Sequence, residues 1–350
     1  MFLEFWNNLP SLWKTISIIT TALSVILALY LRWLRIKKIR IELKEKQTEK
    51  EYKISDKASL PYKESNYDLF NSTTQEFYRL RYQANRIKSF ELQHLDNIHN
   101  ILNVSKPNVL DIGCADGSVA LDRFHDSKKW GKIFGIDNQA SLISQANSKN
   151  ISNFSFYTFN INKLCKENFD LKKHFGEPIH LIFCTMSIHH MGKKNQLAIL
   201  KYLWRQLENN GILYIRSFDD SLKLSCSEYS DLIDELILIS ASIPGASDRY
   251  HGRKLFNQLI SLTNNAQNII MDYFMTDTIH MTNEEKESYF QYAYGFRLDR
   301  VKTTYEEYPE IKELYERASK IIELLKPEFI YNDSFYALSG ESIAYAIKKS

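Results

Sequence analysis

The chain has 350 residues, of which 44% are hydrophobic, and this is enough material for one large folded domain with an additional N-terminal segment. Its 45 Lys and Arg residues and 42 Asp and Glu residues give a net charge of only +3, which does not indicate a nucleic-acid partner. The cysteines form no C-x-x-C pair, so the sequence predicts no structural metal site and suits a reducing compartment; they are Cys114, Cys165, Cys184 and Cys226.

An apolar stretch lies close to the N-terminus. No residue from 15 to 31 is charged, and Trp13 and Trp33 flank the stretch. A helix of this length spans about 26 Å, close to the hydrocarbon thickness of a bilayer, and flanking tryptophans are typical of membrane interfaces. We therefore expect residues 1–35 to form a transmembrane anchor. A buried core helix and a signal peptide are the alternatives, but the chain lacks the basic start and the small-residue cleavage site of a signal peptide.

The charges around this stretch predict its orientation. Only Glu4 and Lys14 precede it, whereas five basic residues follow it directly, namely Arg32, Arg35, Lys37, Lys38 and Arg40. By the positive-inside rule, the rest of the chain then lies in the cytoplasm. The same basic residues are suited to contact anionic lipid head groups.

Two segments connect the anchor to the first predicted strand. Residues 36–61 are dense in Lys and Glu, and we expect a charged linker or a solvated helix. Residues 62–104 are expected to form an N-terminal helical segment. This segment carries several aromatic and basic side chains that would pack on the edge of a sheet, namely Tyr67, Phe70, Phe77, Tyr78, Arg79, Arg81 and Tyr82.

The stretch from Val109 to Gly117 is the most informative part of the sequence. An apolar run places Asp111 near the end of a buried strand, and Gly113 and Gly117 follow at a spacing that lets the backbone turn tightly and approach a ligand. A second short strand, residues 132–137, ends at Asp137, a position at which a carboxylate accepts hydrogen bonds from ribose hydroxyls. The alternatives are an ordinary tight turn and, for Asp137, an N-cap of the helix predicted at 139–149.

Further apolar runs alternate with helical patterns along the chain. The alternation predicts an α/β fold with a mostly parallel sheet of seven strands and helices on both faces. A helix with leucines at helical spacing is predicted at 195–208, and inserted helices at 283–325. The remaining five strands are predicted at 154–159, 178–184, 211–215, 268–279 and 335–348.

The motif Asp111-x-Gly113-x-Ala115-x-Gly117 resembles motif I of class I S-adenosylmethionine (SAM) dependent methyltransferases, with Ala115 in place of the middle glycine. A dinucleotide-binding motif would need G-x-G-x-x-G, and two of its three glycines are missing here. The resemblance covers about residues 75–220. It implies a Rossmann-like, doubly wound fold with a methyltransferase domain at 105–350, helical insertions at about 220–265 and 283–328, and a segment at 62–104 that closes over cofactor and substrate.

The same resemblance implies which residues bind SAM. Asp111, Gly113 and Gly117 would surround its methionyl end, and Asp137 would hold the ribose. Asn160 stands where many members place an acid against the adenine amino group, and an amide carbonyl can also accept from that amine. The full set of expected cofactor-binding residues is Asp111, Gly113, Cys114, Ala115, Gly117, Asp137, Asn138, Asn160, Ile161 and Thr185.

Two adjacent histidines follow the fourth predicted strand. Because ligands of such sheets bind beyond the carboxyl ends of the strands, His189 and His190 are expected near the transferred methyl group. His190 is the candidate general base and His189 a pocket residue, while the alternative for both is simple packing. No Asp/Asn-Pro-Pro-Tyr or Pro-Cys motif follows this strand, which argues against enzymes that methylate adenine or cytosine in DNA.

The sequence thus predicts a membrane-anchored, cytosol-facing methyltransferase. We expect it to transfer the methyl group to an oxygen or nitrogen, less favourably a carbon, of a small-molecule, lipid-associated or peptide acceptor. The sequence pattern indicates no oligomeric state. A non-catalytic SAM-binding sensor or scaffold and an NAD-dependent oxidoreductase are the alternatives. The long region after Phe218 is expected to shape the acceptor pocket, and the loop 247–254 either binds a polar or anionic acceptor or is a solvated helix start.

Overall fold

The computed structural model of the chain describes residues 74–225 and 228–349, which lie within a unit of residues 63–350. The expected anchor, the charged segment 36–61, and Tyr67 and Phe70 of the N-terminal helical segment all fall outside these residues. Within the described ranges, no helix combines the length and the apolar character needed to cross a membrane.

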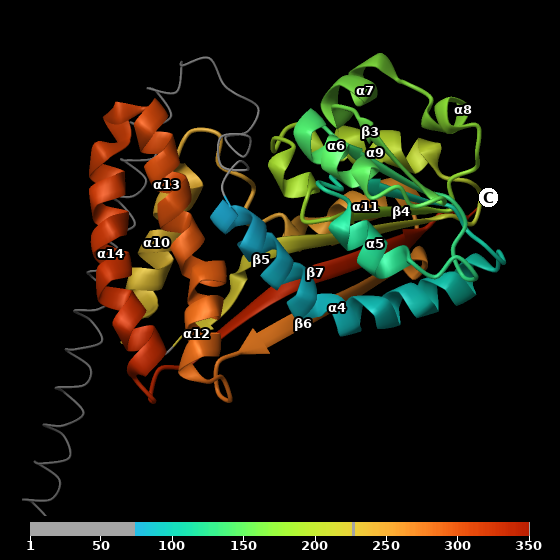
Figure 1. Cartoon of the computed structure of the whole chain (residues 1–350). Helices are drawn as coiled ribbons and strands as arrows, with labels where there is room; N and C mark the ends of the chain where they lie inside the picture. The colour runs from blue at the N-terminus through green and yellow to red at the C-terminus, as the bar shows by residue number, and fades with distance from the viewer. Residues whose placement is uncertain (1–73, 226–227, 350) are drawn as a thin grey trace, which may run out of the picture. The chain divides into compact units, whose positions relative to one another are not determined.

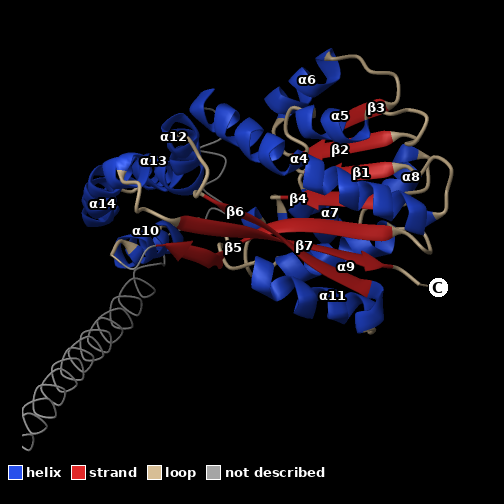
Figure 2. Ribbon diagram, turned by 90° about the horizontal axis from the view of Figure 1, so that it is seen from below, coloured by secondary structure: helices blue, strands red, loops and turns tan. Residues whose placement is uncertain are grey.

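A seven-stranded sheet forms the centre of the fold, with the strand order β3-β2-β1-β4-β5-β7-β6 (Figure 2). β1 to β5 are mutually parallel, and β7 runs antiparallel to both of its neighbours. The predicted mostly parallel sheet of seven strands is therefore confirmed. The strands are β1 (Val109–Ile112), β2 (Ile133–Asp137), β3 (Phe154–Thr158), β4 (Leu181–Thr185), β5 (Ile212–Ser225), β6 (Ile269–Asp277) and β7 (Ala337–Ile347).

Helices cover both faces of this sheet because alternate residues of its strands point to opposite sides. In β1, Val109 packs in a core with α4 (Thr74–Leu102), α5 (Ser118–Phe124) and α6 (Ala140–Ser148). Its neighbour Leu110 packs in the core of the other face. The helices of that second face are α7 (Ile161–Glu167), α8 (Leu171–Phe175), α9 (Gln196–Gln206) and α11 (Leu255–Thr263).

A third core lies among helices at one end of the sheet (Figure 1). It joins α10 (Ser230–Ser242), α12 (Asn283–Phe290), the π-helical segment η4 (Gln291–Gly295), α13 (Phe296–Glu307) and α14 (Lys312–Tyr331). Phe218 of β5 and Ala337 of β7 belong to the same core, so these helices are anchored on the sheet. Short 3-10 turns complete the fold, namely η1 (Ile188–His190), η2 (Gly252–Lys254), η3 (Ala266–Asn268) and η5 (Pro309–Ile311).

The fifth strand is much longer than the sequence pattern predicts. The prediction ended it at residue 215, whereas β5 continues to Ser225 along β7, with a register shift between Phe218 and Lys223. The added residues are largely polar, so they show no apolar alternation. Their charged side chains are stabilised by distant partners, as when Arg216 pairs with Glu91 of α4 and Glu341 of β7.

Candidate active site

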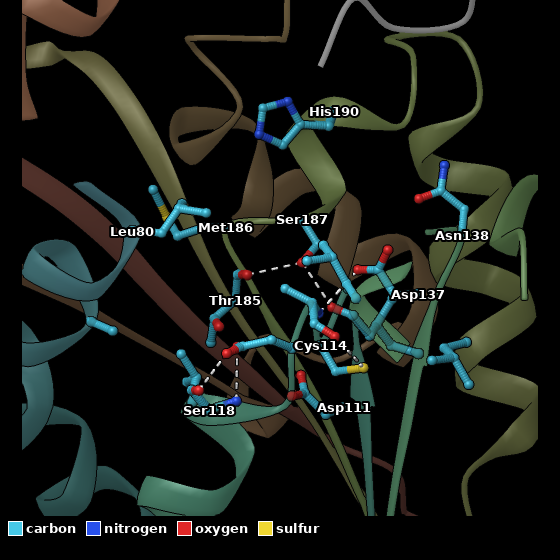
Figure 3. Close-up of a pocket in the computed structure, with 18 of the residues that line it drawn as sticks. Leu80, Asp111, Cys114, Ser118, Asp137, Asn138, Thr185, Met186, Ser187 and His190 are labelled. Carbon is cyan, nitrogen blue, oxygen red and sulfur yellow. Dashed lines mark hydrogen bonds between the residues drawn. The ribbon is translucent and has the colours of Figure 1, made fainter. Parts of the chain in front are cut away.

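A cavity of about 370 Å³ lies at the carboxyl ends of β1, β2 and β4 (Figure 3). This volume falls within the range of small-molecule sites, and the position is where open α/β sheets bind ligands. α4 contributes part of the lining through Leu80, Arg81, Gln83, Ala84 and Asn85. Most of the expected site residues line the same cavity, namely Asp111, Gly113, Cys114, Ala115, Asp137, Asn138, Asn160, Ile161, Thr185 and His190.

The turn after β1 has a backbone conformation that few residues adopt. Gly113, Ala115 and Gly117 have φ angles of 74°, 47° and 72°, in the left-handed region. A Cβ on Gly113 would lie 2.4 Å from Ser187 Oγ, so only glycine fits between β1 and the loop after β4. Ala115 adopts this conformation at a cost of about 1 kcal/mol, which its surroundings must offset. The strained turn holds the backbone close to the cavity.

Asp137 connects this turn to the end of β2. Its Oδ2 accepts a hydrogen bond from Ala115 N at 3.0 Å, and its Oδ1 accepts one from Gln139 N at 2.9 Å. The N-cap of α6 is Gln139, so Asp137 supports the helix start without being its N-cap. Asp137 also lines the cavity, so its carboxylate lies both at the turn after β1 and beside the space that a ligand would occupy.

Asp111 is the second carboxyl group of the cavity. Asp111 is only 3% exposed. Burial, with smaller contributions from the negative charges of Asp137 and Glu91, raises the pKa of Asp111 to about 8. Bringing a cation into the cavity would oppose all of these effects and favour the ionised form. The end of the cavity formed by β1 and β2 is therefore suited to a positively charged ligand.

A comparison of the sequence with models of protein families shows the family of the chain. The family model described as a methyltransferase domain matches residues 103–289, which is more than half of the chain. The chain belongs to this methyltransferase family. It is therefore an enzyme, and its cofactor is SAM. No curated protein sequence matches the chain.

Several solved structures resemble the methyltransferase. The plantazolicin methyltransferase BamL, in complex with a triazolic desmethylPZN analog and SAH, is 15% identical, with 81% of this chain and 93% of that chain covered and a TM-score of 0.42. The YcgJ protein from Bacillus subtilis is 15% identical, with coverages of 75% and 99% and a TM-score of 0.43. The cyclopropane synthase MmaA2 from Mycobacterium tuberculosis is 12% identical, with coverages of 73% and 83% and a TM-score of 0.39.

Asn160 of the methyltransferase is engaged differently from the expectation. Its side-chain oxygen accepts hydrogen bonds from Asn162 N at 3.0 Å and Lys163 N at 3.3 Å and thereby caps α7. Both lone pairs of this oxygen are in use, so the expected contact of the carbonyl with an adenine amino group would have to displace a capping bond. The apolar neighbours Leu142, Phe159 and Ile161 line this side of the cavity and offer a surface for a flat ring.

The two histidines occupy different positions. His190 lines the cavity, whereas His189 is 1% exposed and lies behind it, with Nδ1 3.4 Å from Ser217 Oγ. Burial, and then the positive charges of nearby side chains that include Arg300 and Arg249, hold the pKa of both rings well below the usual value. His190 is thus neutral at pH 7, as a base must be, but it is a weak proton acceptor.

Gly117, like His189, does not line the cavity. Gly117 is the N-cap of α5, where a Cβ would lie 2.6 Å from the Phe156 ring, so its glycine serves the packing of α5 against β3. Sequence reasoning missed Arg216 and Ser187 and, among the α4 residues that line the cavity, named only Arg81. Arg216 could have been found, because it directly follows the predicted fifth strand and therefore lies at the same sheet edge.

Proposed function

We propose that SAM binds across the ends of β1 and β2, with its methionyl end at Asp111 and Gly113 and its ribose at Asp137. SAM supplies an electrophilic methyl group on a positively charged sulfur. The acidic character of this end of the cavity, the glycine at position 113 that leaves room for Ser187, and the place of Asp137 in the cavity lining at the end of β2 support the assignment. Ala115 N is held by Asp137, so the turn and the ribose site form one unit.

We further propose that the acceptor enters at the end of the cavity formed by His190, Met186 and α4. The enzyme would then transfer the methyl group to an oxygen or nitrogen, less favourably a carbon, of a small-molecule, lipid-associated or peptide acceptor. Alignment of the two reactants supplies much of the rate, since proximity alone lowers a barrier by several kcal/mol. The depressed pKa of His190 favours a nucleophile that needs little or no proton removal.

A cytosolic location at a membrane completes the proposal. The uncharged stretch 15–31 and the basic residues that follow it support an anchor with the enzyme on the cytosolic side. An anchored active site would favour acceptors that are themselves at or near the membrane. The family assignment argues against the NAD-dependent alternative.

Transfer of a labelled methyl group tests the proposed reaction. The full chain is incubated with SAM carrying a tritiated methyl group and, separately, with a lipid extract, a small-metabolite extract and a mixed peptide digest. We expect label to enter one of these pools and to be lost with Gly113→Ala, because a Cβ there collides with Ser187. Tight SAM binding with no transfer to any pool would contradict the proposal and favour the non-catalytic sensor.

A further inference from the structure

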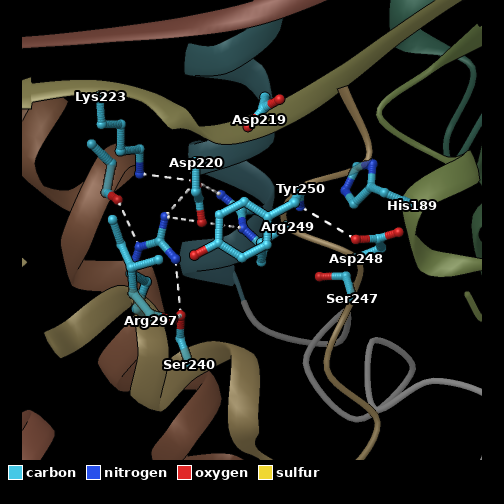
Figure 4. Close-up of polar contacts among 12 residues, drawn as sticks. His189, Asp219, Asp220, Lys223, Ser240, Ser247, Asp248, Arg249, Tyr250 and Arg297 are labelled. Atoms are coloured by element: carbon cyan, nitrogen blue, oxygen red, sulfur yellow. Dashed lines mark hydrogen bonds and ion pairs between the residues drawn. The ribbon is translucent and has the colours of Figure 1, made fainter. Parts of the chain in front are cut away.

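A cluster of buried charges lies near His189, at the junction of β5 with α10 and α13 (Figure 4). We call it the cationic cluster, and it comprises Asp220, Lys223, Arg249 and Arg297. The side chains of Asp220 and Arg297 are fully buried, and that of Arg249 is 4% exposed. The loop 247–254, which carries Arg249, is thus not merely a solvated helix start.

The cationic cluster contains more positive than negative charge. Arg249 and Arg297 each bind both oxygens of Asp220, at 2.9 to 3.0 Å, and Lys223 Nζ lies 3.2 Å from Asp220 Oδ1. Among the described residues, Asp220 is the only carboxylate that pairs with these two arginines. The neighbouring carboxylates have their own cations, since Asp219 pairs with Arg253 and Asp248 with Lys254.

The excess of positive charge in the cationic cluster affects the pKa of Lys223. Burial, followed by the positive charge of Arg297, lowers the pKa of Lys223 to about 7 in spite of Asp220. Burial alone would raise the pKa of Asp220, but the charges of Arg249, Arg297 and Lys223 hold it well below the usual value. An uncompensated buried cation is costly, and an added anion would reduce that cost.

Direct contacts connect the cationic cluster to the cavity. The guanidinium of Arg249 lies 4.1 Å from the centre of the Phe218 ring, and the His189 ring packs on Phe218 at 5.5 Å between centres. Asp248 N donates to His189 O at 2.8 Å, so the loop that carries Arg249 is fixed to the histidine pair. His190, whose ring centre is 4.1 Å from that of His189, lines the cavity.

Arg300 of α13 adds a further buried cation at this place. Its residue is 5% exposed, and its Nη1 donates to Ser247 Oγ at 2.8 Å. The positive charge of Arg300 acts on both His189 and His190. In addition, His189 Nε2 is buried and has no hydrogen-bond partner within residues 74–225 and 228–349.

We propose that the methyl acceptor carries an oxyanion, a carboxylate or a phosphate group, which binds at the His189–His190 end of the cavity beside Arg249 and Arg300. This inference rests on the proposed function. The cavity then has two ends of opposite character, with Asp111 and Asp137 at the cofactor end and the arginines behind the histidines at the acceptor end. The arginines do not line the cavity themselves, but their positive charges act through the buried histidine pair, where a low dielectric strengthens their attraction for an anion.

Calorimetric titration of the full chain saturated with S-adenosylhomocysteine (SAH) tests the inference. The probes are 4-hydroxybenzoate, phenyl phosphate and, as the neutral counterpart, 4-hydroxybenzamide. We expect at least one anion to bind at least about tenfold more tightly than the amide. The benzoate and phosphate titrations show which oxyanion the site prefers.

Matched variants locate the binding site. Arg300→Gln should lower the affinity for the preferred anion by about tenfold and leave the affinities for the amide and for SAH unchanged. Arg300→Lys keeps the positive charge and should therefore lose less of the affinity for the anion. Arg253→Gln is the control, because this half-exposed arginine is already paired with Asp219 and should have no effect.

Three results would overturn the inference. The first is equal affinity of the wild-type enzyme for 4-hydroxybenzoate, phenyl phosphate and the amide. The second is no measurable binding of either anion to the SAH-saturated chain, and the third is an equal loss of anion affinity with Arg253→Gln. The first comparison needs no variant and therefore holds even if Arg300→Gln fails to fold. Failure of the wild-type chain to bind SAH would instead count against the proposed function.

Discussion

Asp111 links the chemistry of the cavity to the stability of the fold. Its buried carboxyl group has a pKa of about 8, compared with 3.8 for an exposed aspartate. Between these values the folded protein binds a proton that the unfolded chain does not bind. The free energy of unfolding therefore falls as the pH rises through this window, by at most about 1.4 kcal/mol per pH unit from this group.

Asp111→Asn tests this linkage. The variant cannot ionise at this position, so its free energy of unfolding without ligand should fall less than that of the wild type between pH 5 and pH 8, with a difference of a few kcal/mol. Urea unfolding at several pH values measures it. Asp126→Asn, at an exposed turn, should leave the wild-type profile unchanged. Parallel profiles for wild type and Asp111→Asn would show that this carboxyl group is ionised throughout.

At the residue scale, the sequence predicted those parts of the site that depend on local spacing. Asp111, Gly113 and Asp137 follow strands whose apolar runs are short and clear, so their positions at one sheet edge could be inferred. The contribution of Leu80 could not be predicted, because it depends on where α4 crosses the sheet. The capping role of Asn160 also escaped prediction, since an asparagine before a helix fits both a cap and a ligand contact.

At the element scale, β5 shows where long-range contacts decide the structure. The apolar first part of this strand was predicted, but its polar continuation to Ser225 was not. Arg216 Nη1 donates a hydrogen bond to Glu341 Oε2 at 2.5 Å, and Arg297 Nη2 donates one to Asp220 Oδ1 at 2.9 Å. The two partners are 125 and 77 residues apart in the chain, respectively. No local pattern encodes such partners. The contact of Asp220 with Arg297 attaches α13 to β5, and Arg297 Nη1 also donates to Ser240 of α10.

Asp220→Asn tests the importance of this attachment. The change leaves two buried guanidinium groups without their carboxylate and should lower the free energy of unfolding at pH 7 by about 3–5 kcal/mol. Because the pKa of Asp220 is depressed in the folded state, its contribution is present above the pKa of the unfolded chain and is lost as the pH falls. The two proteins should therefore converge in stability in acid.

Asp219→Asn is the matched control in the same denaturant titration. Its partner Arg253 is half exposed, so this substitution should cost on the order of 1 kcal/mol. If both substitutions lowered the free energy of unfolding by the same small amount, the ion pairs of Asp220 would not be important for the attachment of α13 to β5. An undiminished difference between wild type and Asp220→Asn at low pH would contradict the proposed ionisation.

At the scale of the whole molecule, the account joins an enzyme to a membrane anchor. The domain from 74 onward has its own cores on both faces of the sheet and among α10, α12, α13 and α14. We therefore expect the chain without residues 1–35 to remain folded and to move from the membrane fraction to the soluble fraction. Fractionation of cells followed by immunoblotting measures the distribution.

Two controls sharpen this prediction. Trp13→Ala leaves the uncharged stretch intact and should stay with the membrane, and the full chain should resist a carbonate wash that releases peripheral proteins. A truncated chain that stays in the membrane fraction would show that another part of the molecule holds it there.

The central claim is that the turn after β1 and the carboxylate at the end of β2 together bind SAM, and calorimetric titration with SAH tests it most directly. We expect one saturable site in the wild type, no binding of NAD, and an affinity for SAH that Asp137→Asn lowers by roughly ten- to a hundredfold, since hydrogen bonds to a charged group are lost. Asp126→Asn, whose carboxylate also accepts from the backbone two residues later, is the control and should bind normally. Unchanged SAH affinity in folded Asp137→Asn, or tight binding of NAD to the wild type, would contradict the account.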